Sequence, residues 1–433
     1  MGAVLVKRVL MVGFHFPPIA GASGVHRMLR FSQYLPQFGW NPSVLTITPR
    51  AYPMVDDRQA YATPGLSIYR AFGLDSARHL SIAGRYPQII ALPDRWISWW
   101  PAAVARGLAV VARERPRVIW STYPIATAHL IGLTLHRMTG LPWVADFRDP
   151  MHDALHPYTP VPKAANRWVE RSSVRACARA VVTAPGTLRM FEERYPDVPR
   201  SRFRLIANGF DEDDFSAAGA RGADAGTPAG AGPLTLLHSG ILYPIERDPQ
   251  AFFGALARLL RAGRLAPGDL RVVLRATGHD RETQALIDRH GVGGVVELAP
   301  LIPHAQAIAE ILRADGLLTL QGATCNHQIP AKVFEYLRAG RPILALTDPG
   351  SDTASLLREA GIDTIAPLDS EEAIAGELER FLERVRAGTA PVAAAGYVAG
   401  CSRRARTAEL AALLDEVIGE RRVTEAAQSS AYS

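Results

Sequence analysis

Cysteine is scarce in this sequence, and long apolar runs are absent. No uninterrupted apolar stretch approaches the roughly 20 residues that a membrane-spanning helix needs. Lys7 and Arg8 interrupt the first apolar run, which favours a β-strand there over a signal peptide. We therefore expect a cytoplasmic protein that is soluble or peripheral on the inner membrane face. The three cysteines suit a reducing compartment and match no zinc or redox spacing: Cys177, Cys325 and Cys401.

Signatures of several other protein classes are also missing. Neither half of the chain has the GxGxxG dinucleotide fingerprint, which argues against a nicotinamide dehydrogenase. The formal net charge is +6, but no nucleic-acid motif accompanies this excess, so we expect no nucleic-acid partner. The 48% apolar and 21% charged residues are instead typical of a globular enzyme. The 433 residues are too many for one ordinary core and are enough for two α/β domains.

The first half of the sequence alternates apolar, strand-like runs with amphipathic helical patterns. Such alternation is typical of a parallel sheet with helices on both faces. Helical patterns lie, for example, at 25–36 and 168–179. The strand-like runs are 4–13, 42–48, 117–121, 143–147, 180–184 and 204–207.

A segment rich in glycine and alanine, 216–233, interrupts this alternation and reads as a linker. The alternation then starts again from a new first strand. We predict two doubly wound, Rossmann-like α/β domains, residues 1–215 and 234–401, with a C-terminal helix at 402–422 that packs back on the first. The second half shows strand-like runs at 234–239, 270–277, 295–298, 316–320 and 342–346, and helical patterns at 249–262, 282–290 and 332–339.

The loop after the first strand is a candidate binding site, because ligands of doubly wound sheets bind beyond the carboxyl ends of the strands. Gly21 and Gly24 would let backbone N–H groups approach an anion at a helix N-terminus. The same glycines also fit a plain strand–helix turn. On the helix that follows, His26 and Arg27 are candidates for binding an acceptor pyrophosphate, with ordinary surface residues as the alternative.

Three motifs follow one another along nearly the whole chain. The first motif combines FPP at 16–18, the glycines that follow it and FGW at 38–40. The second is NGFDEDDF at 208–215. The third spans 330–342 and begins with PAKVFEYL. In this order they resemble bacterial retaining glycosyltransferases of the GT-B group, family four in particular. The run WVADFRDP at 143–150 resembles a branch that builds exopolysaccharides, capsules and O-antigens.

This resemblance implies a GT-B fold, with two Rossmann-like domains facing each other across a cleft. It implies transfer of a sugar from a nucleotide diphosphate sugar to an acceptor hydroxyl, with retention of configuration by front-side attack. No cofactor is expected beyond the donor substrate, since a helix dipole and basic residues take the place of a metal ion. The branch implies a polyprenyl-diphosphate-linked saccharide acceptor, contact with the inner membrane face and a role in cell-surface polysaccharide assembly.

The third motif supplies the clearest donor-binding residues. Pro330 suits a helix start, and Ala331 follows it. Glu335 can accept hydrogen bonds from two ribose hydroxyls, which is the role the family gives to this position. Lys332, a turn earlier, can reach a phosphate. For both charged residues the alternative is a solvated surface helix.

Two positions depart from the family pattern. The family's Glu-x7-Glu motif would place a carboxylate at position 327, where this chain has His327. We expect Asn326, His327 and Gln328 to recognise the sugar instead. Many members carry a histidine where this chain has Arg148, followed by Asp149. Arginine cannot act as a base near neutral pH, so Arg148 would bind a phosphate or orient Asp149. Asp149 is a candidate base, or else a helix cap.

The loop after the strand 234–239 contains Gly240 and Arg247. A departing nucleotide requires a glycine beside the diphosphate and an arginine to neutralise its developing charge. The family places a basic residue just ahead of the next helix, where Arg247 stands. The alternative pairs Arg247 with Glu246 or Asp248 at the surface.

Two other functions remain open for the same fold. A nucleotide-sugar epimerase would need acid and base carboxylates, of which the sequence offers few candidates. A catalytically inert, membrane-associated assembly partner is favoured by His327 and Arg148 and opposed by the retained Glu335, Lys332 and Arg247. The aromatic segment 93–101 fits either a membrane or acceptor contact or, as we prefer, packing in a core.

Overall fold

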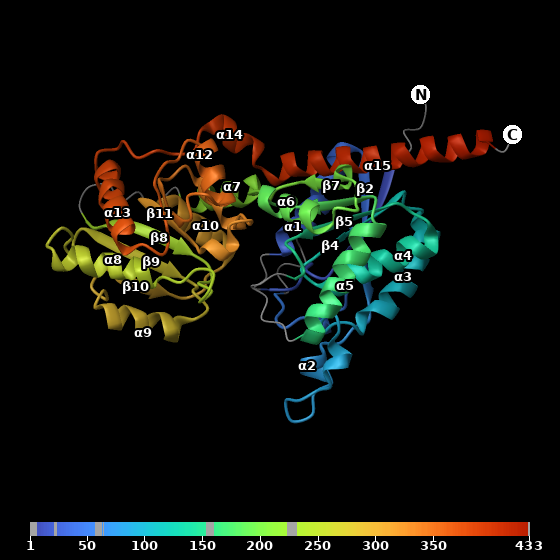
Figure 1. Ribbon diagram of the computed structural model, residues 1–433, viewed down its shortest axis with the longest axis horizontal. Coiled ribbons are helices and arrows are strands. Elements are labelled where there is room, and N and C mark those ends of the chain that lie inside the picture. The colour runs from blue at the N-terminus through green and yellow to red at the C-terminus, as the bar shows by residue number, and fades with distance from the viewer. Residues whose placement is uncertain are drawn as a thin grey trace. The chain divides into compact units, whose positions relative to one another are not determined.

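The computed structural model describes residues 7–20, 24–56, 63, 65–152, 160–222 and 232–431. The chain divides into two compact units: unit 1 is 1–207 with 403–433, and unit 2 is 208–402. Each unit holds its own parallel sheet (Figure 1). Each unit also has its own apolar core. The predicted architecture of two doubly wound α/β sheets is confirmed. Across the described residues, no helix has both the length and the apolar character needed to cross a membrane.

Unit 1 is built on a seven-stranded sheet with the order β3-β2-β1-β4-β5-β6-β7, in which every pairing is parallel. Its central strands are buried along most of their length, as expected where helices cover both faces. The strands are β1 (Lys7–Gly13), β2 (Trp40–Ile47), β3 (Ser67–Ala71), β4 (Val118–Thr122), β5 (Trp143–Arg148), β6 (Arg179–Val182) and β7 (Phe203–Leu205).

The helices of unit 1 include the C-terminal helix of the chain. Leu410, Leu414 and Val417 of this helix belong to the core of unit 1, and Arg179 pairs with Glu416 at 2.6 Å. Trp99 is buried in the same core, which agrees with the core interpretation of the segment 93–101. The helices are α1 (Val25–Tyr34), α2 (Ser76–His79), α3 (Trp99–Glu114), α4 (Ala126–Thr139), α5 (Pro160–Ala176), α6 (Pro185–Arg194) and α15 (Arg403–Ala431).

Unit 2 is built on a six-stranded parallel sheet with the order β10-β9-β8-β11-β12-β13. Its strands are β8 (Leu234–Ser239), β9 (Leu270–Arg275), β10 (Val296–Ala299), β11 (Gly316–Gln321), β12 (Ile343–Thr347) and β13 (Ile365–Ala366). Its helices are α7 (Glu212–Gly222), α8 (Gln250–Arg261), α9 (Asp280–His290), α10 (His304–Arg313), α11 (Ala331–Ala339), α12 (Asp352–Glu359), α13 (Glu371–Arg386) and α14 (Ala395–Gly400).

The compact units divide at 207/208, whereas the sequence pattern placed the end of the first domain at 215. The reason lies in the contacts of α7, which packs against α10. Arg338 of α11 pairs with Glu212 and lies over the rings of Phe210 and Phe215. Helix α7 also extends into the predicted linker, whose residues 223–231 lie outside the described part of the chain.

The order of strands creates one crevice in each sheet. In unit 2, β8 lies between β9 and β11, so the connections leaving β8 and β11 turn to opposite sides. In unit 1 the same arrangement occurs at β1 and β4. Ligands of open α/β sheets bind at such points, outside the carboxyl ends of the strands. The loops that follow these four strands are therefore the ones that position a site.

Candidate active site

The crevice of unit 2 brings Gly240 and Lys332 into direct contact. Gly240 directly follows β8 and has φ of +122°, a conformation that L-residues rarely adopt. A Cβ atom at this position would lie 2.8 Å from Nζ of Lys332. Glycine is thus required here for two reasons, the backbone conformation and the close approach of the lysine.

The position of Lys332 is set by a buried histidine, His238 of β8. Nζ of Lys332 lies 3.1 Å from Nε2 of His238, whose Nδ1 lies 2.9 Å from the carbonyl oxygen of Leu318 on β11. Because that carbonyl can only accept, Nδ1 carries the proton and Nε2 accepts a hydrogen bond from the lysine. Burial, followed by the charge of Lys332, holds the pKa of His238 well below 6.5. His238 is therefore neutral at physiological pH.

A second basic residue, Arg247, acts on Lys332 through its charge. Burial and then the charge of Arg247 lower the pKa of Lys332 well below its usual value. The Arg247 guanidinium donates to the carbonyl oxygen of Ile241 at 2.9 Å and lies over the Tyr243 ring. Among the residues that the structure describes, neither cation forms an ion pair with a carboxylate. Two neighbouring unpaired cations favour a bound anion.

Helix α11 presents its N-terminus at the same crevice. Pro330 is the N-cap residue and Ala331 the first helical residue, and no side chain caps the helix. The backbone N–H groups of this first turn therefore add to the positive potential near Lys332. Glu335 is half-buried on the same helix, and its charge acts on Lys332 by raising the lysine pKa. The hydroxyl of Tyr336 accepts from the backbone N–H of Ser239 at 2.9 Å, which ties the helix to the end of β8.

The loop that carries His327 is fixed by hydrogen bonds to residues at the carboxyl ends of β11 and β12. Gln321 donates to the carbonyl oxygens of Cys325 and Gln328 at 2.6 and 2.9 Å. Asn326 donates to Asp348 at 2.6 Å. His327 itself is half-buried, beside the side chain of Gln328 at 3.4 Å. The loop is thus fixed by buried amide groups, and it offers imidazole and amide groups in place of the family's carboxylate.

In unit 1, Arg148 lies at the carboxyl end of β5 in a strained conformation. Its φ is +60°, unusual for a non-glycine residue, and the backbone N–H of Asp149 donates to the carbonyl oxygen of Phe147 at 2.6 Å across it. The guanidinium donates to the carbonyl oxygen of Tyr123 at 3.3 Å, while its buried Nε has no hydrogen-bond partner among the described residues. Burial lowers the pKa of Arg148.

Arg148 shares its surroundings with His15 and Gly24. A Cβ at Gly24, the N-cap residue of α1, would lie 2.5 Å from Nδ1 of His15 and 3.1 Å from a guanidinium nitrogen of Arg148. Burial, and then the Arg148 charge, lowers the pKa of His15 to about 3. The structure therefore brings Arg148 together with Gly24 of the first loop. Gly21 lies outside the described residues.

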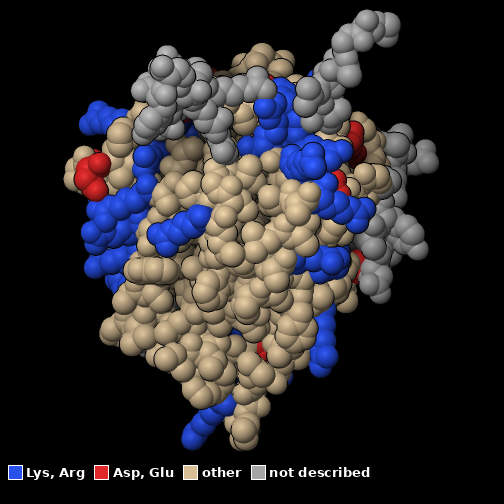
Figure 2. Space-filling model, turned by 90° about the vertical axis from the view of Figure 1, so that its right-hand side faces the viewer, with Lys and Arg blue, Asp and Glu red and all other residues tan. Residues whose placement is uncertain are grey.

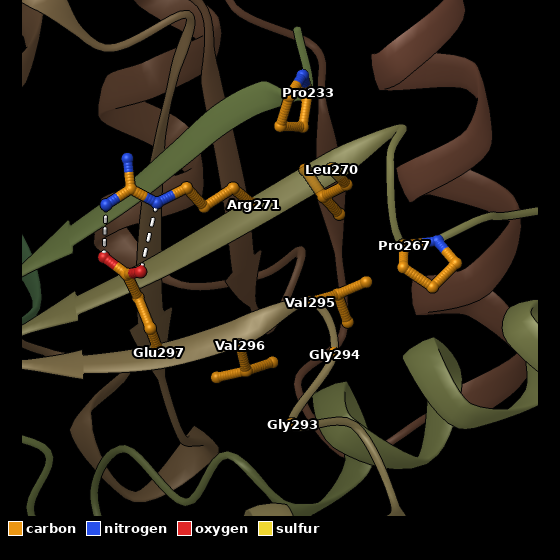
Figure 3. Close-up of a pocket in the computed structure, with 9 residues that line it drawn as sticks. All are labelled: Pro233, Pro267, Leu270, Arg271, Gly293, Gly294, Val295, Val296 and Glu297. Atoms are coloured by element: carbon orange, nitrogen blue, oxygen red, sulfur yellow. Dashed lines mark hydrogen bonds and ion pairs between the residues drawn. The ribbon is translucent and has the colours of Figure 1, made fainter.

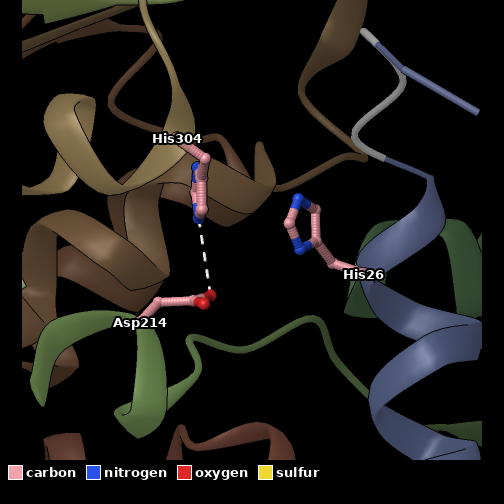
Figure 4. A group of neighbouring side chains, drawn as sticks. All are labelled: His26, Asp214 and His304. Atoms are coloured by element: carbon pink, nitrogen blue, oxygen red, sulfur yellow. Dashed lines mark ion pairs between the residues drawn. The ribbon is translucent and has the colours of Figure 1, made fainter. Parts of the chain in front are cut away.

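The other residues proposed for the acceptor side lie on α1. Arg27 is buried, donates to both carboxylate oxygens of Asp146 at 2.8 and 3.0 Å, and donates to the carbonyl oxygens of Ile206 and Ala207. The hydrogen bonds of its guanidinium are thus used by groups near the carboxyl ends of β5 and β7. His26 is half-buried on the same helix. Figure 4 draws His26 together with a pair in unit 2, in which His304 lies 3.4 Å from Asp214 and connects α10 to α7.

Two cavities of unit 2 are lined by residues other than Gly240, Lys332 and Arg247, although the second includes Gln321 and Asp348, which hold the His327 loop. One, of about 250 Å³, is formed where β8, β9 and β10 begin (Figure 3). Gly240, by contrast, follows the carboxyl end of β8. Its charged residues, Arg271 and Glu297, pair with each other at 2.6 Å. The other, of about 490 Å³, is lined by Asp248, Asp348 and Asp369 near the start of α8 and carries no cation. Neither cavity offers the unpaired positive charge of the crevice.

Two residues of these sites escaped the sequence analysis, His238 and His15. His238 lies inside a predicted strand, where an alternating buried position gives no functional signal, and its partner is 94 residues away. His15 stands in the first loop next to the residues already selected there. An isolated histidine between phenylalanines was the only signal, and it is a weak one.

The chain resembles known proteins in part of its sequence and in its fold. Residues 24–209 match the family described as glycosyl transferase 4-like domain. No curated protein matches the sequence. A trehalose 6-phosphate synthase from Burkholderia multivorans superposes with a TM-score of 0.65 at 13% identity, covering 97% of this chain and 98% of that one. Sucrose-phosphate synthase from Thermosynechococcus elongatus gives 0.60 at 15% identity, covering 99% and 100%.

A third similar structure is that of Anabaena HepE in complex with UDP, with a TM-score of 0.60 at 12% identity, covering 97% of this chain and 100% of that one. At these low identities the superpositions show the fold alone. The domain match covers most of unit 1. The expected GT-B fold and transferase class are confirmed. The chain has the GT-B fold of known glycosyltransferases, and its residues 24–209 match the family described as glycosyl transferase 4-like domain.

Proposed function

We propose that the enzyme transfers a sugar from a nucleotide diphosphate sugar and that the crevice of unit 2 binds the nucleotide. The observation that carries this proposal is the pair of basic residues Lys332 and Arg247, beside Gly240 and the N-terminus of α11, which form no ion pair with a carboxylate among the described residues. A diphosphate supplies the missing negative charge. Glu335 would accept hydrogen bonds from the ribose hydroxyls. HepE, which has the same fold, has been crystallised with UDP and with UDP-glucose.

The proposed reaction proceeds with retention of configuration and without a metal ion. Lys332, Arg247 and the helix N-terminus would stabilise the charge that develops on the departing diphosphate, which is the main requirement of the transition state. His327 and its amide neighbours would bind the sugar in place of a carboxylate. Arg148 would bind a phosphate or orient Asp149, and Asp149 would take up the proton of the acceptor hydroxyl.

For the acceptor we propose a polyprenyl-diphosphate-linked saccharide, used in cell-surface polysaccharide assembly at the inner membrane face. The support for it is the resemblance of the run 143–150 to enzymes of that branch. A lipid-linked acceptor would require the enzyme to work at a membrane surface. This part of the proposal depends on acceptor chemistry and is independent of nucleotide binding.

Isothermal titration with UDP, GDP and dTDP tests the nucleotide site directly. We expect micromolar to millimolar binding of at least one of them, and a loss of about tenfold or more in Glu335→Ala, because the ribose hydroxyls lose a charged acceptor. Glu372→Ala, an exposed carboxylate in the first turn of α13, is the matched control and should bind like the wild type. If no nucleotide binds, or if Glu335→Ala binds normally, the proposal fails.

A further inference from the structure

A hairpin spanning residues 76–93 projects from unit 1 (Figure 1). It begins with the short helix α2 and turns back between Ile82 and Arg85. The backbone N–H of each of these two residues donates to the carbonyl oxygen of the other, at 2.8 and 3.0 Å. The two residues between them, Ala83 and Gly84, both have positive φ, as a tight two-residue hairpin turn requires. The tip is therefore a defined turn.

The hairpin exposes large aliphatic side chains around this turn. Ile82 is 85% exposed, Ile89 76% and Leu80 40%. Isolated exposed apolar residues are ordinary, but here three of them fall within ten residues of one projecting element. In water they contribute nothing to the core of unit 1. Such a group is typical of a surface that becomes buried in another phase or against a partner.

The charge of the hairpin favours a negatively charged partner surface. Residues 76–93 include Arg78, His79 and Arg85 and no aspartate or glutamate. Arg85 is exposed beside the turn. Figure 2 shows that the projecting lower end of this face carries basic and uncharged side chains. Aliphatic residues flanked by arginine, without acidic residues, match the apolar interior and anionic headgroups of a lipid bilayer.

The base of the hairpin is anchored firmly enough to hold the tip in place. Asp75 is fully buried, accepts from the backbone N–H of Ala77 and lies 3.4 Å from Arg95. Ser76 donates its hydroxyl to the carbonyl oxygen of Ile90 at 2.7 Å and its N–H to that of Arg95 at 2.8 Å. The two arms are thus tied together at the base, and their apolar side chains point outward without support from the core.

From these observations we infer that the 76–93 hairpin is a membrane-docking element, which inserts Ile82, Ile89 and Leu80 into an anionic lipid bilayer while Arg85 contacts the headgroups. This inference deepens the membrane contact proposed above for a lipid-linked acceptor. It does not depend on the donor site, and its test uses no nucleotide.

The test is binding of the full chain to extruded vesicles, either phosphatidylglycerol with phosphatidylcholine or phosphatidylcholine alone. We expect binding to the anionic vesicles and a loss of at least about tenfold in the double variant Ile82→Asp, Ile89→Asp, since two inserted aliphatic side chains are replaced by charges. Met138→Asp, which alters a side chain 59% exposed on α4, is the matched control and should bind like the wild type.

The charge contribution is tested with Arg85→Gln. This variant should bind anionic vesicles several-fold more weakly and with a flatter salt dependence, whereas Arg200→Gln, a side chain 85% exposed elsewhere on unit 1, should change neither. Unchanged thermal unfolding of the double variant would show that its fold is intact. The inference is overturned if the wild type ignores anionic vesicles, if the double variant binds them normally, or if sedimentation shows that the variant merely dissociates a dimer of this chain.

Discussion

Lys332 donates to Nε2 of His238, a fully buried histidine that is itself held by the carbonyl oxygen of Leu318. The histidine fixes where the ammonium group points without adding a charge. The proposed nucleotide site therefore rests on a chain of contacts that begins inside the sheet. This relationship makes His238 a positioning residue, one that acts on the ligand through Lys332.

Replacing His238 should weaken donor binding more than it slows the reaction of bound donor. In His238→Leu the lysine loses its acceptor, so we expect KM for the donor to rise about tenfold, the effect of one charge-assisted hydrogen bond. His238→Gln retains an acceptor and should recover part of the affinity. Steady-state kinetics with both variants, and with His290→Gln as a control away from the crevice, would measure this. Equal KM values in His238→Leu and the wild type would contradict the role.

The contact between Gly240 and Lys332 leads to a second prediction. Gly240→Ala places a Cβ 2.8 Å from Nζ and imposes φ of +122° on an L-residue. We expect a loss of stability of about 1–3 kcal/mol and, in addition, weaker nucleotide binding because Nζ must move. Gly263→Ala is the matched control, since Gly263 also has positive φ but has open space around its Cβ position. Gly263→Ala should lose stability but bind the nucleotide like the wild type. Denaturant unfolding and calorimetry of both variants would separate the two effects, and normal binding by Gly240→Ala would contradict the prediction.

Much of the fold could be predicted from the sequence because its strands are buried on both faces. Continuous apolar runs such as those of β1, β4 and β12 are visible without any knowledge of their neighbours. The edge strand β3 was not predicted, since most of its residues are half-buried or exposed and its apolar pattern is short. The compact units divide at 207/208 and not at 215, because Arg338 contacts Glu212 and Phe215.

The candidate site was less predictable because its contacts join residues that are distant in the sequence. Arg27 was a candidate for a pyrophosphate, but Asp146, 119 residues later, pairs with its guanidinium. The strained φ of Arg148 has no sequence signal, since arginine does not favour that conformation. The glycines that follow the strands and the helix of the third motif indicate where a site lies. They do not show which charges the fold leaves unpaired.

Chelators should leave the transferase reaction unchanged. Lys332, Arg247 and the N-terminus of α11 together supply the positive potential that the departing diphosphate needs, so no metal ion is expected to take part. Transfer rates measured with excess EDTA, and again with added Mg²⁺, should agree within about twofold. A loss of most of the activity in EDTA that Mg²⁺ restores would contradict this prediction.

Acid should destabilise the folded protein through its buried histidines. Burial, joined by Arg148 for His15, lowers the pKa of His15 and His129 to about 3, and burial holds that of His238 well below 6.5. Between pH 6.5 and 3 the unfolded chain binds protons at these residues that the folded chain does not bind. Stability is therefore lost as the pH falls through this interval, by up to about 1.4 kcal/mol per pH unit for each histidine.

The variant His129→Gln tests that dependence outside the proposed sites. His129 is fully buried, with Nδ1 2.8 Å from the hydroxyl of Ser121. Glutamine does not titrate, so the variant should lose stability less steeply between pH 6.5 and 4.5 than the wild type, even if it is less stable at pH 7. Urea unfolding at several pH values would measure both slopes. Parallel slopes would show that His129 is already protonated in the folded state.

Arg148 combines a strained backbone with a guanidinium that forms no ion pair with a carboxylate among the described residues, which is the pattern expected of a residue kept for function. Both Arg148→Ala and Arg148→Gly remove the side chain, so both should lose transferase activity, by about tenfold or more. They differ in the backbone, because glycine adopts φ of +60° freely and alanine does not. We therefore expect Arg148→Gly to be more stable than Arg148→Ala by about 1 kcal/mol. Unfolding measurements and transfer assays on the same samples would test both parts. Retained activity in either variant would remove Arg148 from the reaction, whatever its effect on stability.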